Sequence, residues 1–443
     1  MPPIIPVPLL AALRDLPQAP LWVGLSGGLD SSALLHLLAH HPPAHAAGLR
    51  AVHVHHGLHA RADAWADHCV DLCSALGVPL TVVPVSVARS AGTGPEAAAR
   101  DARYAAFAET LADGDVLVLG HHRDDQAETF LLRALRGSGP GGLAAMRRWR
   151  MHGNTRVWRP LLDTARSELK TYAQSQGLAW IEDPSNADVA FDRNFVRDRV
   201  LPLFRERWPH ADAAFARSAG LLADADELLD DGDTVALAQV ATADATCLSA
   251  SGLQRLPAAR RARVLRRWVA GLHLPPLPGN GVERIDRDLL TARADAEARF
   301  AWQGVAVVRW RDLLHAGRQR PALPPDWRLP WDGSEPAALP GGGVLRLIGS
   351  DRLPSPCTLH ARTGAARITL PGRSHSHALK QVLLDLGVPP WQRAQLPLLS
   401  TSDGELLAAG DVAYSAGFDA WLRQHQARLC WTPPGDPVQG ARD

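Results

Sequence analysis

Apolar runs of strand length alternate with helix-like segments through the first 120 residues. Such alternation predicts an α/β fold, with a doubly wound parallel sheet in the N-terminal part of the chain. The expected strands are 21–25, 51–55, 80–85 and 116–120. The expected helices are 33–38, 64–76 and 96–111.

Polar segments follow three of these strands. They are 26–32, 53–59 and 121–128. In parallel sheets of this kind, ligands gather at the carboxyl ends of the strands. We therefore expect the three segments to contribute to one site.

The pattern changes after Arg207. Helical sequence runs from about 211 to 270 and again near 284–294, with strand-like alternation near 301–310. Six prolines between 321 and 340 indicate a stiff linker or a wrapping segment. A mixed module follows, with a strand at 367–370 and a helix at 377–386. The predicted division is an α/β domain 1–210, a mostly helical central domain 211–320, a Pro-rich linker 321–344 and a small α/β C-terminal domain 345–435.

Composition excludes several classes of protein. No apolar run approaches the roughly 18 residues that cross a bilayer, so no membrane partner is expected. The start lacks the positive region of a signal peptide and is broken by prolines. The five cysteines include no Cys-x-x-Cys, and Cys69 and Cys73 are typical of a core pair. We expect a protein of the reducing cytoplasm.

The net charge of +1 hides strong segregation along the chain. Residues 133–170 hold nine basic and two acidic residues, with Trp149 and Trp158 between them, which predicts a nucleic-acid footprint. Residues 211–246 hold eight acidic residues and one arginine, which indicates a solvated helix facing away from any polyanion. A cluster of six arginines in 255–267 fits either a solvated helix face or RNA contact.

The segment Ser-Gly-Gly-Leu-Asp-Ser-Ser, residues 26–32, has the features of a phosphate cradle. The two glycines allow positive φ and a close approach to a ligand, and the amides at the start of a helix favour an anion. The spacing and the lack of a lysine exclude a Walker A loop. An ordinary strand-to-helix turn is the alternative.

A second cluster, His121–Thr129, contains paired carboxylates. If a helix begins near Asp124, then Asp125 and Glu128 share one face. Beside a polyphosphate they could hold Mg²⁺ or a substrate ammonium. A His/Asp metal-dependent hydrolase is an alternative, although it would leave the glycine loop unexplained. Asp124 could also simply cap the helix.

The loop 26–32 resembles the PP-loop of enzymes that cleave ATP between the α and β phosphates. Further segments occur in the order seen in the tRNA(Ile)-lysidine synthase family, and the chain resembles that family near both ends. The N-terminal segments are Val-His-Val-His-His-Gly-Leu at 52–58, then 96–104, Gly-His-His-Arg-Asp-Asp-Gln-Ala-Glu-Thr at 120–129, 135–143, 159–162, 180–186 and 193–197. The C-terminal segments are 379–380, Val-Pro-Pro-Trp-Gln-Arg at 388–393, and 396–398.

The resemblance implies a two-step reaction on the isoleucine tRNA whose anticodon is CAU. The C2 oxygen of the first anticodon cytidine attacks the α phosphate of ATP, and free L-lysine then displaces AMP. ATP and Mg²⁺ are thus implied, as is a change of decoding from AUG to AUA. Domain 1–210 would be catalytic, domain 345–435 would contact tRNA, and a homodimer is compatible with the sequence.

The resemblance also suggests roles for individual residues. ATP would be bound by Ser26, Gly27, Gly28, Leu29, Asp30, Ser31, Ser32 and His55. The expected catalytic residues are Asp30, Asp125, Glu128, Arg100 and Arg103, the last two being three apart on one helix and facing the activated cytidine. Asp30 or Asp125 would hold Mg²⁺, and Asp125 and Glu128 would hold lysine. Contacts to tRNA are expected from Arg193, Asn194, Arg197, Lys380 and Arg393. The glycine-rich 136–142 would be a mobile loop that admits a base, or a plain connector.

Three other functions share some of these features. A small-molecule PP-loop ligase would have the loop 26–32 but not the segment 96–104 or the C-terminal module. A tRNA thiolation enzyme would need sulfur-handling cysteines, and the chain has no Cys-x-x-Cys. A non-catalytic RNA-binding protein would not need Asp30, Asp125 and Glu128.

Overall fold

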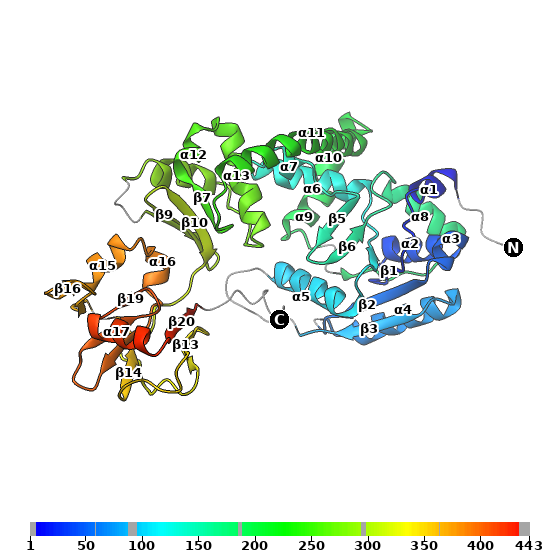
Figure 1. Cartoon of the computed structure of the whole chain (residues 1–443). Helices are drawn as coiled ribbons and strands as arrows, with labels where there is room; N and C mark the ends of the chain where they lie inside the picture. The colour runs from blue at the N-terminus through cyan, green and yellow to red at the C-terminus, as the bar shows by residue number, and fades with distance from the viewer. Residues whose placement is uncertain are drawn as a thin grey trace. The chain divides into compact units, whose positions relative to one another are not determined.

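The computed structural model describes residues 6–57, 59–86, 95–184, 188–293, 298–362 and 364–433 (Figure 1). It divides into two compact units, residues 1–232 and 233–443. The helix α11 (Ala211–Val240) runs through the boundary between them. Within the described residues, no helix is long and apolar enough to cross a membrane.

The first unit is built on a six-stranded sheet in the order β3-β2-β1-β4-β6-β5. Five strands are parallel and β5 is antiparallel to β6, which confirms the predicted parallel sheet. The strands are β1 (Leu21–Gly24), β2 (Leu49–His55), β3 (Leu80–Pro84), β4 (Val116–Val118), β5 (Trp149–His152) and β6 (Thr155–Trp158).

Helices cover both faces of this sheet, because the strand residues alternate between two cores. Leu21 and Val23 of β1 join a core with the helices α2, α4 and α8, whereas Trp22 between them joins Tyr104 and Phe107 of α5. The helices of the unit are α1 (Val7–Ala12), α2 (Leu29–Ala39), α3 (Pro42–Ala46), α4 (Ala62–Leu76), α5 (Pro95–Thr110), α6 (Arg123–Leu135), α7 (Pro140–Leu143), α8 (Arg166–Ser175), α9 (Asp192–Phe195), the π-helix η2 (Val196–Val200), α10 (Leu201–Arg207) and the first part of α11.

The second unit begins with a helical part that packs on a small antiparallel sheet of order β7-β10-β9-β8. The helix expected near 284–294 is shorter and is mostly a π-helix. The elements are β7 (Cys247–Ser249), α12 (Ala250–Arg255), α13 (Ala258–Gly271), α14 (Gly281–Arg284), the π-helix η3 (Ile285–Leu290), β8 (Arg299–Trp302), β9 (Val305–Trp310) and β10 (Leu313–Arg318).

The C-terminal part holds a five-stranded sheet, β11-β14-β17-β18-β19, a three-stranded sheet, β12-β13-β20, and the pair β15-β16. The Pro-rich segment 321–344 is more than a linker, because β11 pairs with β14 and β12 pairs with β13. The strands are β11 (Arg328–Trp331), β12 (Ala337–Ala338), β13 (Val344–Ile348), β14 (Cys357–His360), β15 (Arg367–Ile368), β16 (His377–Ala378), β17 (Leu398–Thr401), β18 (Leu406–Ala409), β19 (Ala413–Tyr414) and β20 (Arg428–Thr432). The helices are α15 (Leu379–Asp385), α16 (Pro390–Arg393) and α17 (Ala416–Gln424).

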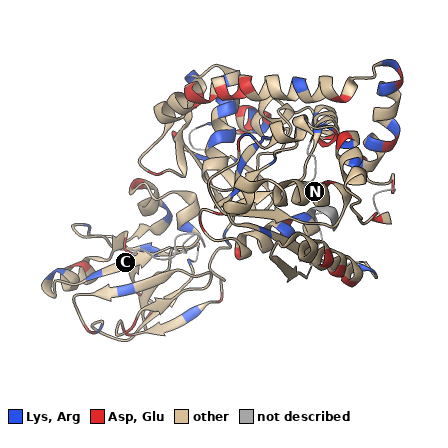
Figure 2. Cartoon of the chain, turned by 90° about the vertical axis from the view of Figure 1, so that its right-hand side faces the viewer, with Lys and Arg blue, Asp and Glu red and all other residues tan. Residues whose placement is uncertain are grey.

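Figure 2 colours the acidic residues red, and those of 211–246 do not all face solvent. Asp212 pairs with Arg205 at 2.6 Å, and Asp226 pairs with Arg147 at 2.8 Å. Asp233 is buried and pairs with two arginines of the 255–267 cluster, Arg260 and Arg263. The predicted solvated face is therefore confirmed for the exposed Asp224 and Asp231 and wrong for the three carboxylates that neutralise arginines within their own unit.

Within the second unit, Trp391 of α16 joins the C-terminal part to the middle part. Its ring stacks on His315 of β10 with centroids 4.2 Å apart, and it meets Trp310 edge-on at 6.1 Å. A guanidinium nitrogen of Arg311 also donates to the carbonyl oxygen of Leu384 at 2.7 Å. The Trp391 side chain therefore acts as a latch between two structural parts.

We expect Trp391→Ala to loosen this latch and lower the free energy of unfolding of the second unit by on the order of 2 kcal/mol, because a half-buried aromatic stack is lost. Limited proteolysis in 318–327 should then become faster. Trp421→Ala is the matched control, because among the described residues the Trp421 ring stacks only on its near neighbours in sequence, Phe418 and His425. Equal cleavage of the two variants would contradict the latch.

Candidate active site

Gly27 shapes the loop between β1 and α2. Its φ is +80°, and an added Cβ would lie 2.5 Å from Cδ1 of Ile181. The amide of Ile181 donates to the Gly27 carbonyl at 2.9 Å. Gly28, in contrast, is the N-cap of α2 with φ −74°, a conformation open to any residue. The expected positive φ is therefore confirmed for Gly27 and wrong for Gly28.

The loop serines hold the turn in place. The hydroxyl of Ser31 donates to the Gly28 carbonyl at 3.1 Å and lies 3.0 Å from the Ser26 hydroxyl. Ser32 is buried, and its oxygen has no hydrogen-bond partner among the described residues. These hydroxyls and the free amides at the start of α2 form a turn that can accept an anion. Leu29 packs into the core behind it.

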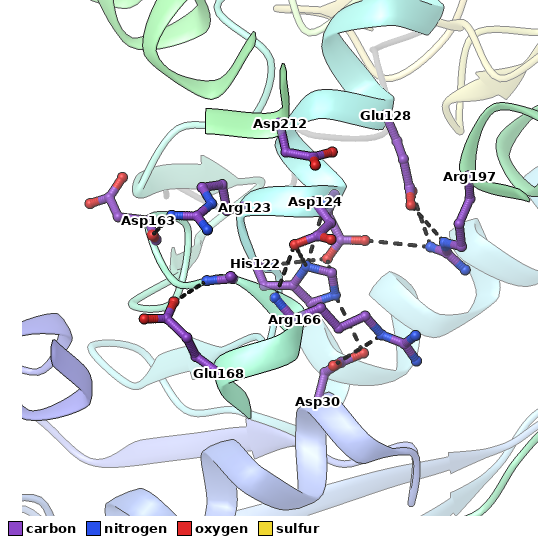
Figure 3. A network of polar contacts seen from close by, with 12 residues as sticks. Asp30, His122, Arg123, Asp124, Glu128, Asp163, Arg166, Glu168, Arg197 and Asp212 are labelled. Atoms are coloured by element: carbon purple, nitrogen blue, oxygen red, sulfur yellow. Dashed lines mark hydrogen bonds and ion pairs between the residues drawn. The ribbon is translucent and has the colours of Figure 1, made fainter. Parts of the chain in front are cut away.

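Asp30 faces His122 and Arg166 across the ends of β1 and β4 (Figure 3). Nε2 of His122 lies 3.5 Å from one carboxylate oxygen of Asp30, and Nε of Arg166 lies 3.6 Å from the other. Burial disfavours a charged His122, but its hydrogen bond to Asp30 and the charges of Asp125, Asp30 and Asp124 outweigh burial and raise its pKa. The strand ends thus bring carboxylates together around one imidazole.

Gly120 makes this convergence sterically feasible. A Cβ on Gly120 would lie 3.0 Å from the backbone carbonyl oxygen of Asp30. The end of β4 therefore packs directly on the first turn of α2. Any larger residue would push the two segments apart and separate His122 from Asp30.

Asp125 and Glu128 are buried on α6 and face two arginines. Asp125 accepts from Nη2 of Arg193 at 2.8 Å, and Glu128 accepts from Nε of Arg193 at 2.7 Å and from Nε of Arg197 at 2.6 Å. Glu128 has no exposed surface. Burial opposes ionisation of Asp125, but His122 and Arg193 overcome it and hold the pKa of Asp125 at about 2.

Asp124 is not the N-cap of α6, so the alternative that it simply caps this helix is wrong. The N-cap is His122, whose Nδ1 accepts from the Asp125 amide at 3.4 Å, while the Asp125 side chain accepts from the His122 amide at 3.0 Å. Asp124 instead accepts from the backbone amide of Arg166 at 2.9 Å and pairs with Arg205. It ties α8 and α10 to the start of α6.

Arg100 and Arg103 are exposed on α5, as is expected of residues that contact a large substrate. The guanidinium of Arg100 lies over the Tyr104 ring at 5.2 Å from its centroid. The charge of Arg103 acts on His56, whose pKa falls to about 4, chiefly through burial. Nε2 of His55, at the end of β2, pairs with Asp63 at 2.9 Å.

Several residues of the basic stretch 133–170 are used inside the unit rather than on its surface. Arg133 donates to the carbonyl oxygens of Gly142 and Ala145, both at 2.7 Å, and so anchors the glycine-rich segment, whose end forms α7. Trp158 is fully buried and stacks on Trp149. Trp158 is therefore a core residue that cannot stack on a base, whereas Trp149 is only partly buried against that core.

The remaining predicted tRNA contacts differ in exposure. Lys380 is exposed on α15, whereas Arg393 is buried, with Nε donating to the Val388 carbonyl at 2.6 Å. Asn194 is also buried, and its amide donates to the Asp188 carbonyl. Ser185 and Asn186 of the segment 180–186, and Leu58 of 52–58, lie outside the described residues.

Sequence reasoning missed two residues of the site. His122 was part of the polar cluster but had no role of its own, and Arg166 was only one of many arginines. A signal for Arg166 was its place at the start of a helix that follows the end of β6. Nothing in the local sequence indicates that Asp30 is its partner.

Comparison with known proteins supports the assignment of these segments. The chain matches three protein families. Their descriptions are "PP-loop domain" for residues 6–204, "TilS substrate binding domain" for 248–315 and "TilS substrate C-terminal domain" for 357–431. It is 52% identical to the tRNA(Ile)-lysidine synthase of Xanthomonas axonopodis pv. citri (strain 306), with 97% of each chain covered. It is 49% identical to that of Xylella fastidiosa (strain 9a5c), with 94% of this chain and 95% of the relative covered.

Solved structures give only distant likenesses. A U34-tRNA thiolase, NcsA from Methanococcus maripaludis, is 18% identical with a TM-score of 0.40, over 48% of this chain and 77% of that chain. A crystal structure titled "TILS C-terminal domain" is 18% identical with a TM-score of 0.20, over 25% of this chain and all of that chain.

We expect Gly27→Ala to lower the free energy of unfolding by roughly 1–3 kcal/mol, because it combines a positive φ with a clash against Ile181. Gly28→Ala is the matched control. Its nearest neighbour would be Ser26 Oγ at 3.5 Å, an ordinary contact, so its stability should stay within about 0.5 kcal/mol of the parent. Chemical denaturation of both variants decides this, and equal stabilities would contradict the strained role of Gly27.

The low pKa of Asp125 predicts a loss of stability in acid. The carboxylate stabilises the fold above its ordinary pKa near 4, and this contribution disappears as the pH falls toward 2. Asp125→Asn should therefore cost on the order of 2 kcal/mol at pH 6, with the difference from the parent shrinking below pH 4. Denaturation curves from pH 6 to pH 2.5 measure this. Asp63→Asn, at an exposed carboxylate, should show no such convergence.

Proposed function

The chain belongs to the tRNA(Ile)-lysidine synthase family, and from this membership we propose that it attaches lysine to the first anticodon cytidine of the CAU isoleucine tRNA. The cytidine C2 oxygen is first adenylated by ATP, and lysine then displaces AMP. The product cytidine reads AUA instead of AUG. Because ATP and tRNA are its substrates, we place the activity in the cytoplasm.

One observation carries this proposal beyond the family assignment. The turn at Gly27 can bind an anion. It lies beside the segment that carries the buried Asp125 and Glu128, because Gly120, which precedes that segment, packs on the backbone of Asp30. A polyphosphate on the turn would therefore end beside Asp30 and His122, 3.5 Å apart. A nucleotide and a positively charged amine can meet at this edge of the sheet, and the reaction needs both.

The loop acts on the departing pyrophosphate. Its amides and the hydroxyls of Ser26, Ser31 and Ser32 would hold the β and γ phosphates, with charge developing on the leaving group. His55, at the end of the neighbouring strand, would contact the nucleotide. No residue of the loop needs to accept a proton in this step.

Asp30 fits a Mg²⁺ ion better than Asp125 does. One oxygen of Asp30 is buried without a hydrogen-bond partner in the described part of the chain, whereas both oxygens of Asp125 have partners. The described residues contain no cluster of three or more metal ligands, so the phosphates would complete the coordination. A bound Mg²⁺ would neutralise phosphate charge.

Asp125 and Glu128 are the proposed partners of the lysine ammonium. Two guanidinium groups now satisfy these carboxylates, which indicates that the site favours cations. Asp125 retains some exposed surface and would contact the amine, while the fully buried Glu128 would orient Arg193 and Arg197. Holding the amine near the adenylated base raises its effective concentration.

The tRNA would contact the first unit through Arg100 and Arg103 on α5 and through Arg193 and Arg197. The buried Asn194 would act indirectly, by holding the Asp188 carbonyl. The exposed Arg100 and Arg103 would face the activated cytidine. In the second unit, Lys380 is an exposed candidate, and the buried Arg393 would act by holding the α16 turn. A homodimer remains a proposal that sedimentation would test.

The test is ATP-dependent transfer of labelled lysine to isoleucine tRNA transcripts. We expect label on the CAU transcript and none on a transcript whose first anticodon base is uridine. Asp30→Asn should reduce lysine transfer by on the order of 10²-fold or more, because Asp30 lies where the phosphates meet the other carboxylates.

Asp71→Asn is the matched control for charge, since Asp71 is exposed on α4 and the proposal gives it no role. It should retain lysine transfer within a few-fold. Pyrophosphate release that needs a small molecule and no tRNA would contradict the proposal and indicate a small-molecule ligase.

A further inference from the structure

Arg159 is a buried cation that follows β6 and has no carboxylate partner among the described residues. It is 4% exposed, and Nη1 donates to the Arg147 carbonyl at 3.0 Å. The Tyr104 side chain of α5 lies close enough to raise the pKa of Arg159, although burial, the larger effect, lowers it. Burying a guanidinium without a counter-ion is costly unless its N–H groups find acceptors, and the remaining acceptor is the ring of His121.

That contact determines the state of His121. Nε of Arg159 lies 3.3 Å from Nδ1 of His121. An arginine nitrogen can only donate, so Nδ1 must accept, and the imidazole carries its hydrogen on Nε2. The pKa direction agrees with a neutral ring. Burial, with the charges of Arg159, Arg193 and Arg100, outweighs Asp125 and lowers the pKa of His121 to about 3.

The hydrogen on Nε2 is available to a ligand. Within the part of the chain that is described, no group accepts a hydrogen bond from this atom. The residue is only partly buried and Nε2 is not fully enclosed, so a ligand can approach this atom. His121 follows Gly120, which packs on the Asp30 carbonyl, so the His121 backbone lies beside the start of α2 and the phosphate-binding turn.

We propose that His121 is a catalytic residue that donates a hydrogen bond from Nε2, as a neutral imidazole, to a non-bridging oxygen of the ATP α phosphate. Arg159 is the positioning residue that fixes this tautomer. The inference rests on the proposed function. With the β and γ phosphates on the loop, the α phosphate would lie at the loop's edge, where the backbone of His121 passes.

The donor acts on charge and transfers no proton. The cytidine C2 oxygen forms a bond to the α phosphorus, and the bond from that phosphorus to the bridging oxygen breaks. The electron pair leaves with pyrophosphate, and the base takes up the positive charge. A fixed neutral donor can stabilise the crowded phosphoryl oxygens without losing its own hydrogen.

The tautomer is tested without any turnover. Nitrogen-15 NMR of the full chain, with the His121 signals assigned by their loss in His121→Gln, should show the hydrogen on Nε2 from pH 6 to pH 8. Arg159→Met should give a mixture of tautomers. A hydrogen on Nδ1, or a charged ring at pH 7, would overturn the proposal even if the Arg159 variant failed to fold.

The catalytic role is tested by single-turnover adenylation of the CAU transcript. His121→Ala should slow adenylation by on the order of 10²–10³-fold with little change in KM for tRNA, because a donor to the reacting phosphate is removed. His121→Gln, whose amide nitrogen can take the place of Nε2, should stay within about tenfold of the parent. His121→Asn, whose amide lies nearer the place of Nδ1, should resemble His121→Ala.

His210→Gln is the matched control, since His210 is exposed and precedes α11. It should adenylate at the parent rate. Parent-like adenylation by His121→Ala would overturn the catalytic role. If the unmodified chain adenylates no tRNA, the proposed function fails and this role fails with it. The NMR result then separates that outcome from an error in the tautomer.

Discussion

The site depends on two glycines, which let neighbouring segments approach more closely than a side chain would allow. Gly27 lies against Ile181, and Gly120 lies against the carbonyl of Asp30. Because the backbone at Gly120, just beyond β4, closely approaches the backbone of Asp30, Asp30 and His122 come within ion-pair distance although they are far apart in sequence. A methyl group at either glycine would have to displace a neighbour. The chemistry at this edge of the sheet therefore follows from a steric condition before any charge is considered.

Burial and pairing then separate the roles of the carboxylates. Two guanidinium groups contact Asp125 and Glu128 where little water reaches. Burial opposes ionisation of Asp125, but His122 and Arg193 outweigh it and keep the pKa of Asp125 low. Removing one partner from such a network leaves an unpaired buried charge, which is strongly destabilising. Asp30 differs because one of its oxygens accepts no hydrogen bond within the described residues. Its ion-pair contacts, with His122 at 3.5 Å and Arg166 at 3.6 Å, are longer than those of Asp125 and Glu128, so it can take a new ligand at a lower cost.

The sequence predicted the parallel sheet and the position of the loop well, because both rest on local patterns. Strand-length apolar runs, a Gly-Gly turn and a following helix are each visible within about ten residues. The partners of the side chains were not predictable in this way. Aspartate is a common helix-capping residue, yet His122 caps α6 and Asp124 binds the start of α8. Such choices depend on which segments meet in three dimensions.

Charge counts along the chain were the least reliable guide, for a physical reason. An arginine contributes the same charge to a count whether it faces solvent or holds a buried oxygen. Arg133 donates to backbone carbonyls, Arg147 pairs with α11, and Arg159 is buried beside His121. Their planar, permanently charged groups suit internal hydrogen bonding in fixed directions. The basic stretch therefore builds the inner framework around the site, and only its exposed members, such as Arg150 and Arg156, remain available to attract an anionic tRNA.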